Sequence, residues 1–216
     1  MAWLRRKSYD RSRSLSEAAR ARSRGNATKA IARYREVLEH EPLNIDVHRR
    51  LAPLLAGTRQ ADDAWDSYRI AVAHLVRKGF LDQAIGVLRE AAGCLGKQRA
   101  VWEELAAVEQ ERGRPIDAHA ALLEGRHRFR SHQDGPDAIQ LLLRARKLAP
   151  EDFETNFDLA GLLVRSGAGG PAAHILFQLA ERSSGRPLRR VRRLQFRLAP
   201  SADALWGWIR AWFGRR

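Results

Sequence analysis

The chain has 216 residues, of which 44% are hydrophobic, so it is long enough to bury a substantial core, and its single cysteine, Cys94, excludes an intramolecular disulfide framework. No apolar stretch resembles a secretory signal or reaches the run of about 18 residues that spans a bilayer, so we expect a cytoplasmic protein without a transmembrane segment. The formal net charge of +14 lies entirely at the ends, because residues 1–24 carry +6 and residues 183–216 carry +8 around a neutral body.

Helix-forming residues occur along the whole chain, and no alternating run of β-branched residues is present, so the sequence predicts an all-α fold. In chain order, Ser14 and Glu17 form a capping-box pattern that predicts the start of the first helix. Asn26 and Asn44 are placed to cap the next two helices, and Pro42 to separate them. The predicted helices span residues 14–24, 27–39, 45–56, 62–78, 81–92, 99–112, 117–130, 137–148, 154–166, 171–181 and 187–198, followed by a last helix capped by Ser201.

One pattern recurs along these helices: a small residue followed four and seven positions later by apolar or small residues. Ala64 begins one copy, with Tyr68 and Ala71 in the later places. Between the copies, 34-residue and 20-residue intervals alternate, because the copies begin at Ala30, Ala64, Ala84, Ala118, Ala138 and Ala172. Two interleaved 54-residue periods result, and they predict a repeat protein.

Residues around this pattern resemble the tetratricopeptide repeat (TPR) family, whose unit is two antiparallel helices in about 34 residues. The resemblance covers about residues 11–182 and rests on Ala18, Ala21, Gly25, Ala30, Tyr34, Val37 and Pro42 in the first copy, and on Trp102, Leu105, Ala106, Gly113, Leu159, Ala160, Leu163 and Gly167 in later copies. It implies an α-solenoid of helix-turn-helix repeats. The 20-residue intervals depart from the family, so we expect helices 62–78 and 117–130 each to serve also as the first helix of the following copy.

Three regions follow from the pattern and the charge. We predict a basic, frayed N-terminal segment at 1–13, a TPR-like repeat array at 14–182, and a basic, Trp-rich pair of capping helices at 183–216.

Catalytic, metal and cofactor patterns are not evident in the sequence. The loop 93–97 lacks the spacing of a phosphate loop, and the five-residue spacing of His127 and His132 does not place two imidazoles on one helical face. We therefore expect no enzyme and no cofactor, but a scaffold or adaptor for a protein or peptide partner. In TPR proteins the first helices of successive repeats line a groove, which implies partner-binding positions at Asp46, Arg49, Glu103, Gln110, Phe157 and Val164.

The C-terminal region carries a second hypothesis. The helix 187–198 places Leu188, Val191, Leu194 and Leu198 on one side, opposite an arginine face with the potential to bind anions: Arg189, Arg190, Arg192, Arg193 and Arg197. The last helix has an apolar stripe formed by Leu205, Trp206, Trp208, Ile209, Trp212 and Phe213. If these stripes seal the end of the solenoid, the tryptophans are buried. The alternative function is a basic-ended adaptor that associates with nucleic acid or an anionic membrane surface.

Overall fold

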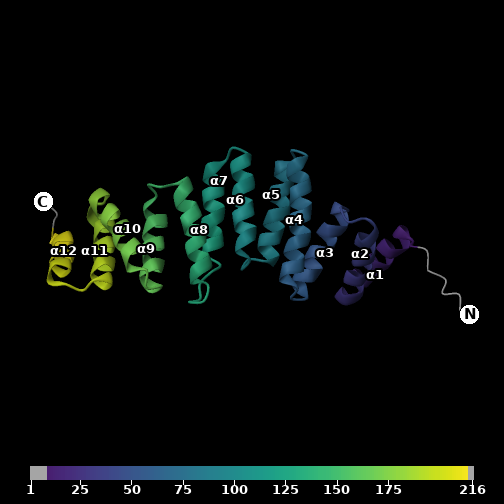
Figure 1. The fold of residues 1–216 in the computed structure, drawn as a ribbon, viewed down its shortest axis with the longest axis horizontal. Helices are drawn as coiled ribbons and strands as arrows, with labels where there is room; N and C mark the ends of the chain where they lie inside the picture. Colours follow the sequence, from purple (N-terminus) through teal and green to yellow (C-terminus); the bar gives the residue numbers. More distant parts are fainter. Residues whose placement is uncertain (1–8, 214–216) are drawn as a thin grey trace, which may run out of the picture. The chain divides into compact units, whose positions relative to one another are not determined.

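The structure, a computed structural model, describes residues 9–213 and is all-α over that range, with twelve helices and no strand (Figure 1). The helices form two compact units, Met1–Arg112 (unit 1) and Gly113–Arg216 (unit 2). The helices of unit 1 are α1 (Arg11–Ser23), α2 (Ala27–His40), α3 (Ile45–Gly57), α4 (Ala61–Arg77), α5 (Leu81–Cys94) and α6 (Arg99–Glu111). Those of unit 2 are α7 (Pro115–Arg126), α8 (Gly135–Leu148), α9 (Phe153–Arg165), α10 (Gly169–Arg182), α11 (Gly185–Leu198) and α12 (Ala202–Phe213).

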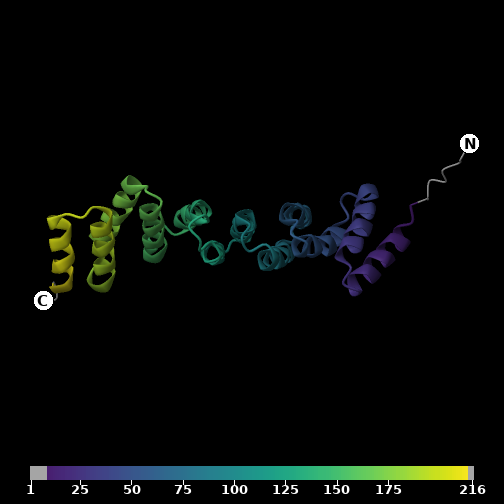
Figure 2. The same ribbon diagram turned by 90° about the horizontal axis from the view of Figure 1, so that it is seen from below.

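Within each unit, every helix packs against the next helix in the chain. Contacts between second neighbours, α3 with α5 and α9 with α11, add a layer of packing between successive pairs. Figures 1 and 2 show these sequential stacks from two directions. Packing between neighbours in sequence is typical of an α-solenoid, so the predicted fold class is confirmed.

Helix boundaries repeat with the 54-residue period that the alanines predict. The helices α2, α5 and α8 begin at residues 27, 81 and 135, while α3, α6 and α9 begin at 45, 99 and 153. The helices α4, α7 and α10 begin at 61, 115 and 169. The helix boundaries therefore recur with a period of three helices. Among the described residues this period occurs three times, preceded by α1 and followed by α11 and α12.

The six signature alanines explain why the period is visible in the sequence. Each one has no solvent-exposed surface: Ala30, Ala64, Ala84, Ala118, Ala138 and Ala172. A buried methyl group permits a neighbouring helix to approach closely, and any larger side chain there would force the helices apart. The repeat is therefore recognisable at the residues whose side-chain size is limited most strictly by helix packing.

The helix α4 follows the prediction made from the 20-residue interval, because it packs against both α3 and α5. Its buried residues include Trp65, Tyr68 and Val72. The prediction for the second long helix was wrong at its C-terminal end, since α7 ends at Arg126 and not at residue 130. The chain turns there because Phe129 folds inward to 3% exposure, and the Arg126 side chain donates a hydrogen bond to the Phe129 carbonyl oxygen.

The turns between helices place one residue in the left-handed region of the backbone. Gly25, Gly79, Gly113 and Gly167 have φ between 72° and 82°, each five residues before a signature alanine. Glycine adopts this conformation without the steric cost that a side chain brings. In the turn before Ala64 the equivalent residue is Arg59, with φ 63°.

A hydrogen bond that closes the loop before α3, α6 and α9 also repeats. His48 Nε2 lies 2.9 Å from the Pro42 carbonyl oxygen, Trp102 Nε1 donates to the Gly96 carbonyl at 3.0 Å, and Asn156 Nδ2 donates to the Pro150 carbonyl at 2.8 Å. The three side chains are spaced by the same period as the alanines, and each reaches back six positions. An imidazole, an indole and an amide therefore make the equivalent hydrogen bond in successive repeats.

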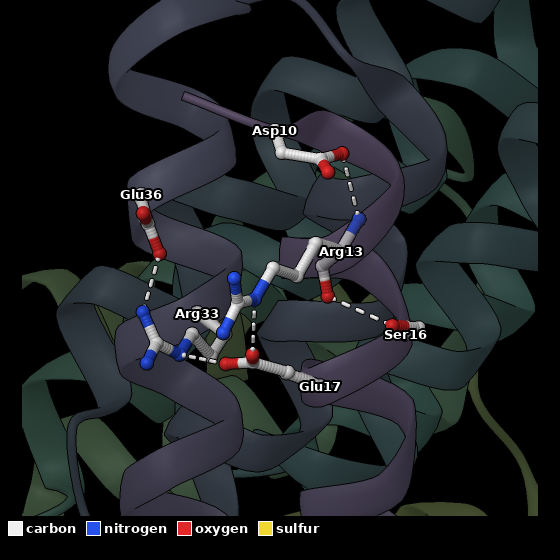
Figure 3. Close-up of polar contacts among 6 residues, drawn as sticks. All are labelled: Asp10, Arg13, Ser16, Glu17, Arg33 and Glu36. Carbon is white, nitrogen blue, oxygen red and sulfur yellow. Dashed lines mark hydrogen bonds and ion pairs between the residues drawn. The ribbon is translucent and has the colours of Figure 1, made fainter. Parts of the chain in front are cut away.

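The start of α1 differs from the prediction. Asp10 is the N-cap, because its carboxylate accepts a hydrogen bond of 3.0 Å from the backbone N–H of Arg13 (Figure 3). Ser14, the predicted cap, lies inside the helix and is buried. The residues 11–13, predicted to be frayed, therefore belong to α1, and residues 1–8 of that predicted segment lie outside the described residues.

Ion pairs join α1 to α2. Glu17 on α1 accepts from Arg13 at 3.0 Å and from Arg33 of α2 at 2.9 Å, and Arg33 also pairs with Glu36 (Figure 3). The hydrogen bond from Arg13 is the main cause of the lowered pKa of Glu17, to which the charge of Arg33 adds. These contacts hold α1 against α2, and α1 contributes Arg22 to the candidate site.

Candidate partner-binding groove

A cleft of about 490 Å³ lies among α1, α3 and α5 of unit 1. Its lining combines both signs of charge with two apolar side chains: Arg22, Asp46, Arg49, Arg50, Pro53, Leu54 and Glu90. Two of the six predicted groove residues, Asp46 and Arg49, line this cleft together. The sequence did not indicate Arg22 or Glu90, which come from the last turn of α1 and from α5.

The amphipathic pattern of α3 places these residues at the cleft. Asn44 caps the helix by accepting a hydrogen bond of 3.2 Å from the Val47 backbone N–H. Val47, Leu51 and Leu55 are buried on one side of α3. Charged residues of α3 therefore face away from the core, and the packing of α3 on α5 brings Glu90 to the same cleft.

Pro53 lies inside α3 and also lines the cleft. A prolyl nitrogen carries no hydrogen, so the carbonyl oxygen of Arg49 lacks the donor that residue i+4 normally supplies in a helix. Arg49 thus brings a guanidinium group to the cleft, and its carbonyl oxygen lacks the usual helical donor.

The charged side chains that line the cleft form no ion pairs with one another. Within the part of the chain that the structure describes, the side chains of Arg22, Asp46, Arg49 and Arg50 make no hydrogen bond or ion pair. Elsewhere in unit 1, most ion pairs join charged residues on adjacent turns or adjacent helices, as Arg33 of α2 and Glu17 of α1 do at 2.9 Å. Three guanidinium groups and the carboxylates of Asp46 and Glu90 leave the cleft with a formal charge of +1.

Glu90 connects the cleft to the core. Its carboxylate accepts a hydrogen bond of 3.3 Å from the hydroxyl of Tyr68, which is fully buried on α4. The same hydroxyl lies 3.8 Å from Sγ of Cys94. Burial, together with the contacts to Cys94 and Glu90, raises the pKa of Tyr68, so the phenol stays protonated and acts as a donor at neutral pH.

The other predicted groove positions lie elsewhere. Glu103 and Gln110 are on α6 in unit 1, outside the lining of this cleft, and Glu103 accepts a hydrogen bond from Arg99 one turn before it. Phe157 and Val164 are on α9 in unit 2. Phe157 stacks on Phe153 with ring centroids 5.6 Å apart, so it takes part in packing within unit 2.

The predicted arginine face of α11 divides between two neighbouring helices and solvent. Arg190 pairs with Glu154 of α9 through both terminal nitrogens, one at 2.9 Å, and lies over the Phe157 ring at 4.4 Å. Arg189 lies over the ring of Trp212 on α12 at 4.9 Å, and Arg192 donates to Gln195. Arg193 and Arg197 are exposed to solvent.

Part of the apolar stripe of α12 is open to solvent, so its tryptophans are not all buried, as they would be if the stripe sealed the end of the solenoid. Trp206 and Trp212 are 60% and 58% exposed. The helix instead packs on α11 through Gly207, which lies beneath the Arg192 side chain, and through Trp208, which stacks on Phe196. Small side chains permit this closer approach. The side chain of Phe213, also in the predicted stripe, lies outside the described residues.

Among residues 9–213 there is no group of three or more His, Cys, Asp or Glu side chains that could hold a metal ion. Asp134, two residues after His132, accepts a hydrogen bond from the Ser131 backbone N–H in the loop before α8. None of the described helices combines the length and apolar character that crossing a membrane requires.

The fold and the repeated helix pairs define the class of this protein: it is an α-solenoid repeat protein built from TPR-like helix pairs. No protein-family model matches the sequence, and no curated protein matches it. Several solved structures are similar. A tetratricopeptide repeat protein from Parabacteroides merdae is 11% identical, with 95% of this chain and 94% of that chain covered and a TM-score of 0.37. PilF of Pseudomonas aeruginosa is 19% identical, with 93% and 88% covered and a TM-score of 0.31. A MamA protein is 15% identical, with 80% and 91% covered and a TM-score of 0.31.

Proposed function

We propose that this chain is a non-catalytic protein-interaction scaffold that holds a segment of a partner protein in the cleft of unit 1. The observation that carries the proposal is the set of charged groups at the cleft, Arg22, Asp46, Arg49 and Arg50, which have no partner among the described residues. Charged groups left unpaired beside an apolar floor are suited to a partner that supplies the complementary charges.

The chemistry of the lining indicates what the partner segment contains. Three arginines exceed the two carboxylates, so a segment with more acidic than basic residues is favoured. Pro53 and Leu54 provide apolar surface for one side chain of that segment. The Arg49 carbonyl offers an acceptor for one of its backbone N–H groups.

Charge reversal tests the proposal. Tagged full-length protein is incubated with lysate of its native cell at moderate salt after nuclease treatment, and retained proteins are identified by mass spectrometry. The double variant R49E/R50E is expected to lose the stoichiometric partner. The matched control K29E/K78E makes the same change in charge at two exposed residues of unit 1 outside the cleft, and it is expected to retain the partner.

Site-specific cross-linking shows where the partner lies. A photoreactive amino acid at Leu54 is expected to cross-link the retained protein, whereas the same group at Ile116, which is 82% exposed, is expected not to. Retention of the partner by R49E/R50E, or cross-linking at Ile116 in place of Leu54, would overturn the assignment of this cleft.

A further inference from the structure

We infer that the α11–α12 helix pair binds the surface of an anionic membrane, with arginines of α11 on lipid phosphates and tryptophans of α12 at the interface. This binding surface lies in unit 2 and does not depend on the cleft of unit 1 or on its proposed partner.

The first observation is that α12 has two apolar sides, of which one is used for packing. Gly207 and Trp208 face α11, and the Trp208 ring stacks on Phe196 with centroids 6.2 Å apart. Leu205, Trp206 and Trp212 are exposed to solvent. Both views of the ribbon place α12 beyond α11 at the C-terminal end (Figures 1 and 2). The exposed side of α12 is therefore a large apolar surface on a short helix.

The second observation is a stripe of arginines along α11. Arg186, Arg189, Arg193 and Arg197 follow one another at intervals of three and four residues, which places them on one side of the helix. The exposed side chains of Arg186, Arg193 and Arg197 make no hydrogen bond or ion pair with any described residue. The stripe is therefore positively charged and free to bind an external anion.

Arg189 joins the two surfaces. Its guanidinium group lies 4.9 Å from the centre of the Trp212 ring, so the arginine stripe of α11 borders the tryptophan side of α12. A cation beside an exposed indole places a phosphate-binding group and an interfacial apolar group at the same depth relative to a membrane surface. Asp203 is the single acidic residue in α11 and α12, so little negative charge opposes an anionic surface.

A lipid surface fits this arrangement better than nucleic acid does. Tryptophan is enriched where membrane meets water, because its ring is apolar and its N–H remains hydrated. Leu205, which is exposed on the same side, gains from burial among acyl chains and has no π-face on which a base could stack. A helix of twelve residues lying along the interface would bury this side while α11 stays at the level of the headgroups.

Vesicle binding of the full-length protein tests the inference. We expect binding to vesicles of equal parts phosphatidylglycerol and phosphatidylcholine, little binding to phosphatidylcholine alone, and release when salt is raised to about 0.5 M. Brominated acyl chains in the anionic vesicles are expected to quench tryptophan fluorescence. The experiment is made with a Trp3→Phe variant, because Trp3 lies outside the described residues. Trp102 and Trp65 are buried in unit 1, so quenching in that variant would report the tryptophans of α12.

Two pairs of variants separate this surface from general attraction of a basic protein. R193Q/R197Q is expected to weaken partition into anionic vesicles about 25-fold, since each arginine near an anionic surface contributes about fivefold. The control K29Q/K78Q removes two exposed charges from unit 1 and is expected to have a much smaller effect. W206S/W212S is expected to lower partition at least about tenfold and to abolish the quenching, whereas F80S/I116S, which removes two exposed apolar side chains elsewhere, is expected to preserve both.

Circular dichroism of each variant confirms that the helices remain folded. Equal effects of R193Q/R197Q and K29Q/K78Q would overturn the inference, as would vesicle binding without quenching. Binding of single-stranded oligonucleotide by the wild type in the absence of vesicle binding would also overturn it and assign the arginine stripe to nucleic acid.

Discussion

Trp102 occupies the position in its repeat that His48 occupies in the preceding one, and each ring nitrogen contacts the carbonyl oxygen of the residue six positions before it. Asn156 makes the equivalent bond in the third repeat. The structure therefore conserves an interaction while the residue type that makes it changes, and a different donor satisfies the equivalent loop carbonyl each time.

Replacing Trp102 by phenylalanine is expected to destabilise the protein by about 2–3 kcal/mol, because the Gly96 carbonyl loses its donor and a gap remains in the core. Trp102 is 1% exposed. Denaturation in urea, followed by circular dichroism, measures the change. The control Trp206→Phe changes an exposed indole and is expected to stay within about 0.5 kcal/mol. Equal losses in the two variants would contradict the role of the hydrogen bond.

Arg59→Gly is expected to stabilise unit 1 by about 1 kcal/mol, since Arg59 has a left-handed backbone that four glycines adopt in the equivalent turns. The side chain of Arg59 is exposed, so its removal should cost little. The reverse change, Gly79→Ala, is expected to destabilise by a similar amount. The two variants are compared by the same urea denaturation, and a loss of stability in Arg59→Gly would refute the explanation.

The ion pair between Glu154 and Arg190 is expected to make α9 and α11 sensitive to acid. Hydrogen bonds from Arg190 lower the pKa of Glu154 in the folded state, although partial burial opposes them. A carboxylate of this kind stabilises the fold fully above its unfolded pKa of about 4.3, and the contribution is lost as the pH falls through the folded pKa.

Thermal unfolding at pH 7 and at about pH 3 measures this contribution. Glu154→Gln is expected to lower the melting temperature at pH 7 and to reduce the difference between the two pH values. Glu181→Gln, an exposed residue of α10 in the same unit, is the control and is expected to behave as the wild type does. An unchanged difference in Glu154→Gln would show that the pair contributes nothing.

Pro53→Ala is expected to raise the stability of unit 1 by about 1–2 kcal/mol, because it restores the helical hydrogen bond to the Arg49 carbonyl. The same change gives the Arg49 carbonyl a helical donor, so affinity for a partner segment that donates to this carbonyl is expected to fall. Urea denaturation and a binding titration with the identified partner measure the two effects. A gain in stability with unchanged affinity would show that the partner does not use this carbonyl.

The sequence predicted the period of the fold well, because the signature alanines are the residues at which helices approach most closely. Any larger side chain at Ala84 or Ala138 would clash with a neighbouring helix, so the pattern can be recognised in every repeat. The start of the first helix was less predictable. Asp10 and Ser14 are both suitable caps four residues apart, and the choice between them depends on burial of Ser14 against the rest of unit 1.

The candidate site was predictable only in part for a similar reason. Asp46 and Arg49 share one helix, so their spacing suffices to place them together. Glu90 reaches the same cleft through the packing of α5 on α3, which no local pattern encodes. On α12, the hydrophobic pattern of the sequence favoured burial of the tryptophan side. In the structure the side that contains Gly207 packs on α11, because glycine permits a shorter distance between the two helices.

The hydrogen bond from Tyr68 to Glu90 has a practical consequence. A partner that binds the Glu90 carboxylate would compete for it with the Tyr68 hydroxyl, whose other neighbour is Sγ of Cys94. Cys94 is exposed and is the single thiol of the chain. The protein therefore carries its own attachment point for one fluorophore, placed where occupation of the cleft would change the surroundings of the dye.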